Sequence, residues 1–70
     1  MKKIDLHGIK YEEVEKIISN ACSKLKAPFI VITGNSEKMK ELVNKTISFF
    51  GLRSTPSSHN PGRMIIDERR

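Results

Sequence analysis

The chain has 70 residues, of which 37% are hydrophobic and 30% charged, a composition typical of a small globular protein. Seventy residues are too few for two independent hydrophobic cores, so we expect a single domain over residues 1–70. Thirteen Lys and Arg against eight Asp and Glu give a formal net charge of +5. This charge favours an anionic partner such as nucleic acid, although a soluble domain can carry it without binding one.

Cysteine content and hydropathy exclude several classes of protein. The one cysteine, Cys22, permits no intramolecular disulfide and offers no thiolate pair for zinc. No apolar run approaches the length of a membrane span, and the residues after Met1-Lys2-Lys3 alternate instead of forming a signal-peptide core. We therefore expect a cytoplasmic, soluble monomer without a membrane partner.

The first half of the chain reads as strand, helix, strand. Alternating polar and apolar residues predict a short strand over residues 3–6. Apolar residues at three- and four-residue spacing predict a helix over residues 11–26, with Cys22 in its core-facing stripe. The continuous run Phe29-Ile30-Val31-Ile32 then predicts a central strand that is buried on both faces.

The second half reads as helix, strand, strand. Ser36 is placed to cap a helix whose inward stripe runs from Met39 to Phe50, and Gly51 is placed to end it. Strands are predicted over residues 52–55 and 63–67, on either side of a loop rich in turn formers. The order βαβαββ predicts an α/β fold with a small four-stranded sheet, both helices on one face and the other face open.

A candidate site follows from this order. In open α/β sheets, sites form beyond the carboxyl ends of parallel strands, and these ends are Asp5-Leu6-His7-Gly8 and Thr33-Gly34-Asn35-Ser36. The two-residue period of a strand places Asp5 and His7 on one side and Leu6 in the core. Gly8 permits close approach of a phosphate, and the helix that starts after Ser36 directs backbone N–H groups to the same edge.

These residues resemble a known family. The segment Ile4-Asp5-Leu6-His7-Gly8, followed by an acidic-led helix, is similar to the opening motif of Smr (small MutS-related) domains. The family's second motif, Thr or His, Gly, any residue, Gly, aligns with Thr33-Gly34-Asn35-Ser36, where Ser36 replaces the final glycine. Its closing Asn-x-Gly aligns with Asn60-Pro61-Gly62, so the resemblance covers essentially the whole chain.

The resemblance implies a fold and an activity. The implied fold is the two-layer fold of the C-terminal domain of translation initiation factor three, a mixed sheet with the last strand antiparallel to the others. The implied activity is endonucleolytic, either cleavage of RNA or nicking of DNA. Under this reading Ser36 either narrows the phosphate site or donates a hydrogen bond to it.

Asp5 and His7 are the candidate catalytic residues. An imidazole exchanges protons near neutral pH, so His7 is suited to remove the 2′-hydroxyl proton of RNA without a metal. On DNA, which lacks that hydroxyl, Asp5 would instead help to bind Mg or Mn and activate water. The alternative for an isolated Asp-x-His is that both residues simply pair with backbone at the strand end.

The candidate nucleic-acid-binding residues surround this pair. Lys38 and Lys40 open the second helix, where an anionic ligand would offset their repulsion by the helix dipole, although they are equally explained as neutral surface residues. Tyr11 is assigned to packing rather than base stacking, and His59 is only a peripheral candidate for a second acid. The candidates are Gly8, Lys10, Thr33, Gly34, Asn35, Ser36, Lys38, Asn60, Gly62 and Arg63, together with a basic patch of Lys2, Lys3, Arg63, Arg69 and Arg70 on the open face.

Two functions stay open on these grounds. The first is a nuclease centred on Asp5 and His7. The second is a noncatalytic module that binds structured RNA, DNA or a ribosomal surface through the same basic residues. Turnover of substrate separates the two.

Overall fold

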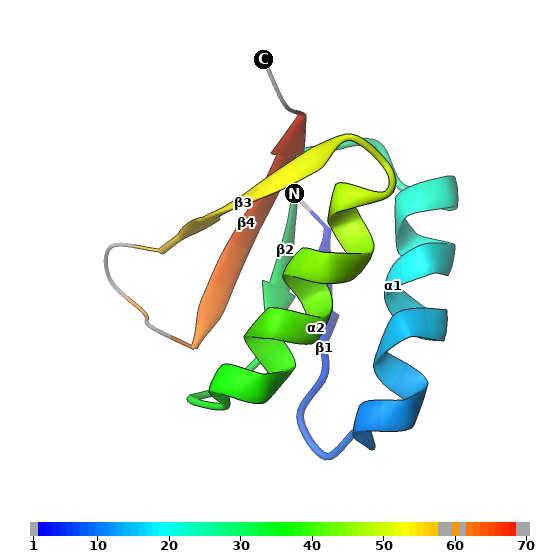
Figure 1. The fold of residues 1–70 in the computed structure, drawn as a ribbon. Coiled ribbons are helices and arrows are strands. Elements are labelled where there is room, and N and C mark those ends of the chain that lie inside the picture. The colour runs from blue at the N-terminus through cyan, green and yellow to red at the C-terminus, as the bar shows by residue number, and fades with distance from the viewer. Residues whose placement is uncertain (1, 58–59, 61, 69–70) are drawn as a thin grey trace.

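A computed structural model describes residues 2–57, 60 and 62–68 of the chain. Its element order is βαβαββ, as the sequence predicts, with boundaries that differ by one or two residues. Both helices cover the same face of the sheet (Figure 1), so the predicted two-layer architecture is confirmed. The elements are β1 (Lys3–Asp5), α1 (Tyr11–Lys24), β2 (Phe29–Ile32), α2 (Glu37–Ser48), β3 (Leu52–Pro56) and β4 (Arg63–Glu68).

The sheet is mixed, with the strand order β1-β2-β4-β3. β1 pairs with β2 in parallel, whereas β4 lies between β2 and β3 and is antiparallel to both. This arrangement confirms that the last strand runs against the others and that β2 is an interior strand. It also brings the end of β1, the end of β2 and the start of β4 to one edge of the sheet (Figure 1). This edge is formed by strand ends and the loops attached to them, not by an outer strand.

The core lies between the sheet and the two helices. Phe29 and Val31 of β2 are buried, but Ile30 and Ile32 are only half-buried. The prediction that this strand is buried on both faces is therefore wrong, because both helices cover the same side. The buried apolar residues are Leu6, Val14, Ile18, Ala21, Phe29, Val31, Met39, Val43, Ile47, Met64 and Ile66.

The C-terminal end of α2 differs from the predicted stripe. The helix ends at Ser48, and Phe50, predicted to face inward, is 42% exposed because it lies beyond the last helical turn. Gly51 ends the segment with φ +71°, a conformation that favours glycine. Cys22 packs against the core but is only partly buried, and this burial raises the pKa of its thiol.

No helix within the described residues is both long enough and apolar enough to cross a membrane.

Two neighbouring isoleucines of β4 test the one-sided core. Ile66 is fully buried beneath the helices, whereas Ile65 is half-buried on the opposite face of the same strand. We expect Ile66→Val to lower the free energy of unfolding by about 1 kcal/mol, because it removes a methylene from a packed site. Ile65→Val, the matched control, should cost clearly less in urea denaturation. Equal costs would contradict a core confined to one face.

Candidate functional site

The first loop is a tight turn that carries His7 at its tip. The backbone N–H of Leu6 extends the sheet by donating to the Ile32 carbonyl at 2.9 Å, and the N–H of Ile9 donates to the Leu6 carbonyl at 3.0 Å. The latter bond closes a four-residue turn in which Gly8, with φ +77°, takes the third position. Leu6 is buried, as predicted, while His7 and Gly8 are exposed.

Asp5 holds this turn in shape. Its Oδ1 accepts a hydrogen bond from the backbone N–H of His7 at 2.8 Å, and both residues are exposed. The described residues contain no hydrogen bond or ion pair between the Asp5 carboxylate and the His7 imidazole. Of the alternative in which both residues pair with backbone, the structure shows the Asp5 half, whereas the His7 imidazole makes no hydrogen bond among the described residues. A catalytic role for either residue stays a prediction.

The second loop, Thr33-Gly34-Asn35-Ser36 after β2, and the third loop, which contains Asn60 and Gly62 before β4, meet through one carbonyl group. The Gly62 carbonyl accepts hydrogen bonds from the backbone N–H groups of Thr33 at 2.8 Å and Gly34 at 3.0 Å. The buried Thr33 hydroxyl also donates toward it at 3.4 Å. Successive backbone N–H groups of this kind commonly bind an anion. Here a carbonyl occupies them, so the N–H groups of Thr33 and Gly34 are not free for a phosphate.

The turn before β4 explains why that carbonyl is so placed. The Asn60 side-chain oxygen accepts from the Gly62 N–H at 3.0 Å, and the Asn60 carbonyl accepts from the Arg63 N–H at 3.1 Å. A Cβ added to Gly62 would lie 3.1 Å from the Gly34 Cα, which is tighter than an ordinary Cβ contact, so a larger residue at position 62 would push the two backbones apart slightly. The Asn60-Pro61-Gly62 motif therefore joins the Thr33-Gly34 motif, although Pro61 itself lies outside the described residues.

The start of α1 also reaches the second loop. Ser36 caps α2 as predicted, because its Oγ accepts from the Met39 N–H at 3.1 Å. The same Oγ lies 3.1 Å from the Tyr11 hydroxyl, and the Lys38 ammonium lies 5.1 Å from the centroid of the Tyr11 ring. Tyr11 therefore links the two helix starts, a contact that no spacing in the sequence indicates.

The lysines at the start of α2 have protein partners. Lys38 lies over the Tyr11 ring, where the cation is attracted to the aromatic face. Lys40 lies 3.8 Å from the Glu37 carboxylate. Both contacts oppose the repulsion of these lysines by the helix dipole. An anionic ligand is therefore not required to explain their position.

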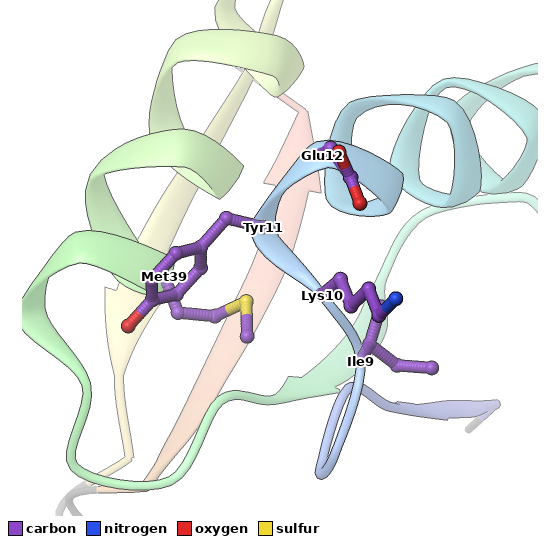
Figure 2. A pocket seen from close by; sticks show the side chains of 5 residues that line it. All are labelled: Ile9, Lys10, Tyr11, Glu12 and Met39. Carbon is purple, nitrogen blue, oxygen red and sulfur yellow. The ribbon is translucent and has the colours of Figure 1, made fainter.

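A shallow pocket of about 580 Å³ opens between the first loop and α2 (Figure 2). Ile9 and Met39 had no site role in the sequence analysis, because Met39 fits the core stripe of α2 and Ile9 belongs to no motif. Only the packing of the two helix starts brings them together. The pocket is lined by Ile9, Lys10, Tyr11, Glu12 and Met39.

The open face of the sheet holds a different part of the predicted site. Asp5, Ile32 and Arg63 are register partners in one row, so Asp5 and Arg63 flank an isoleucine on that face. Lys3 lies one row away, opposite Ile30, toward the end of β1 remote from His7. The predicted basic patch is therefore split along β1 and β4. Arg69, Arg70 and His59 lie outside the described residues.

The remaining candidates are placed singly. Lys10 and Asn35 are exposed at the edge of the molecule where the loops meet, and neither side chain makes a hydrogen bond or ion pair among the described residues. For the predicted Mg or Mn, Asp5 is the candidate ligand, but one of its oxygens already accepts from backbone. Among the described residues, no three His, Cys, Asp or Glu side chains gather closely enough to hold a metal ion. The described residues therefore offer Asp5 as a single carboxylate ligand and no preformed cluster of ligands, and the binding of Mg or Mn stays a prediction.

Substitutions of Ser36 test its position at the junction. Ser36→Ala should lower the free energy of unfolding by about 1 kcal/mol, because α2 loses its side-chain cap, whereas Ser36→Gly should cost only a few tenths. Ser48→Ala, an exposed residue at the far end of α2, is the control. Thermal or urea denaturation measures all three. A Ser36→Ala protein as stable as the unmodified chain would contradict a capping role for the hydroxyl.

The chain was compared with protein-family models, with curated proteins and with solved structures, and none of them matches it. Its function must therefore be inferred from the three loops and from the motifs that they carry.

Proposed function

We propose that this chain is an Smr-type domain that binds RNA at the edge of the sheet where its three loops meet, and that it cleaves RNA with His7. The observation that supports this proposal best is that the three motifs lie together at that edge. Leu6 pairs with Ile32 at the end of β2, and the Gly62 carbonyl binds the next two residues of the chain. Segments that are separate in the sequence thus form one hydrogen-bonded unit.

The net charge of +5 supports a polyanionic partner for this edge. At this edge, Lys10 and Lys38 lie on the side of the helices, whereas Arg63 lies on the open face of the sheet. Such a distribution of cations suits a flexible nucleic-acid strand, because its successive phosphates can each contact a different cation. It suits a single small anion less well, because the Thr33 and Gly34 N–H groups are already engaged.

Cleavage would proceed through the 2′-hydroxyl of RNA. The His7 imidazole accepts the 2′-hydroxyl proton, and the 2′-oxygen then attacks the adjacent phosphorus. The bond from phosphorus to the 5′-oxygen breaks, and that oxygen takes a proton from water. The products are a 2′,3′-cyclic phosphate and a 5′-hydroxyl end. Asp5 contributes by fixing the turn that presents His7, and cations at the edge stabilise the charge on the phosphorane.

RNA is favoured over DNA because the DNA route needs a metal-bound water. The described residues hold no preformed cluster of three or more ligands for that metal, whereas the 2′-hydroxyl route requires only His7 and nearby cations.

A second candidate is a noncatalytic RNA-binding module, with a ribosomal surface among its possible partners. The observation that favours it is that the Asp5 carboxylate accepts from the His7 backbone N–H, while no hydrogen bond among the described residues joins it to the His7 imidazole. This candidate predicts affinity that falls with salt but no product.

Product analysis with His7 variants tests the first candidate. We expect the purified chain to cleave single-stranded RNA, to leave the same sequence in DNA intact and to be unaffected by a chelator. His7→Ala should reduce the rate roughly 100-fold or more, as is usual for loss of an acid–base group. Mass spectrometry of the ends should show the cyclic phosphate. Lys45→Ala, an exposed residue on α2, serves as the control.

Asp5 variants separate positioning from catalysis. Asp5→Asn keeps an oxygen that accepts from the His7 N–H, so it should retain much more cleavage than Asp5→Ala. Equal losses in the two variants would show that the charge of Asp5 matters, and not only its contact with the turn. If His7→Ala is folded by circular dichroism and cleaves as the unmodified chain does, the nuclease proposal is wrong.

A further inference from the structure

We propose that the pocket between the first loop and α2 binds one unpaired nucleobase of single-stranded RNA, with the base against the Tyr11 ring. RNA binding at this edge is taken from the proposed function, whereas cleavage by His7 is not needed. The base pocket therefore specifies which RNA binds at this edge: an RNA with an unpaired base that can unstack from its neighbours.

The pocket has the walls that a base requires. The side chains of Ile9 and Met39 supply apolar surface, and the Tyr11 ring, 46% exposed, forms part of the lining (Figure 2). The Tyr11 hydroxyl lies 3.1 Å from the Ser36 Oγ, and this hydrogen bond ties the far end of the ring to the start of α2. Aromatic platforms of this kind bind unstacked bases of single strands.

The charges around the pocket favour a nucleotide over a purely apolar ligand. Lys10 lines the pocket, and the Lys38 ammonium lies over the ring of the lining residue Tyr11, 5.1 Å from its centroid. A nucleotide within an RNA strand has a phosphate on each side of its sugar, and these two phosphates can each contact one of the two lysines. Glu12 also lines the pocket, and its carboxylate can accept a hydrogen bond from an N–H group on the edge of a base.

The position of the pocket ties it to the first loop. Ile9 and Lys10 follow His7 and Gly8 directly in the chain, and the Ile9 N–H closes the turn that carries His7. A base seated here would therefore hold its own sugar and phosphate beside that turn. Paired and stacked bases of a duplex cannot enter without being extruded, so single-stranded RNA is the expected ligand.

Binding of a fluorescent RNA tests the pocket independently of cleavage. The probe is a ten-nucleotide RNA with one 2-aminopurine, and all variants carry His7→Ala so that the probe stays intact. The reference protein should bind the single strand and quench the 2-aminopurine. Tyr11→Ala should weaken binding roughly tenfold and abolish quenching, because base–aromatic stacking is lost. Tyr11→Phe, which keeps the ring, should retain most of both.

Phe49→Ala is the matched control, because Phe49 is an 80% exposed aromatic residue just past the far end of α2. It should change neither affinity nor quenching. The same RNA made fully double-stranded, or with an abasic site in place of the 2-aminopurine, should bind the reference protein more weakly. Equal affinity for the abasic probe would overturn the proposal, since the pocket would then contact only sugar and phosphate.

Photocrosslinking covers the case in which Tyr11→Ala does not fold. RNA that contains 4-thiouridine should crosslink to the unmodified chain at peptides that contain Tyr11 or Met39, and crosslinks confined to other segments would overturn the base pocket. Unchanged affinity in a folded Tyr11→Ala protein would do the same and would leave the pocket to another partner. Failure of the unmodified chain to bind any RNA would defeat both proposals, whereas binding without cleavage would defeat only the nuclease.

Discussion

The backbone carbonyl of Gly62 is the contact on which the arrangement of the loops depends. It receives the N–H groups of Thr33 and Gly34, and the two backbones lie so close there that a Cβ on Gly62 would crowd the Gly34 Cα at 3.1 Å. The end of β2 is thereby fixed to the start of β4. Because β1 already pairs with β2, the first loop is held against the same unit.

This arrangement of the loops places the candidate residues of the edge on two different faces of the sheet. Asp5 and Arg63 belong to the open face of the sheet, whereas Tyr11, Ser36 and Lys38 lie on the side of the helices. The exposed turn of His7 joins the two. A ligand that contacts both sets must cross this edge of the sheet, so an extended chain fits the geometry better than a compact molecule.

The fold was predictable from the sequence because its signals are local. Periodicity fixed the helices and strands, and Leu6, Ser36 and Gly51 occupy the positions that their residue types indicate. The burial of β2 was misjudged because a continuous apolar run does not reveal that both helices lie on one side. The candidate loops were found, but the use of the Thr33 N–H group by a distant carbonyl and the contact between Tyr11 and Ser36 depend on tertiary packing.

The strand directions also determine where the described chain begins and ends. β1 starts, and β4 finishes, at the edge of the sheet opposite the three loops (Figure 1). Lys2 and Glu68, the first and last described residues, therefore lie on that opposite side. The domain can therefore be tethered through either end, to a second protein or to a solid support, while the loops remain turned toward the solution.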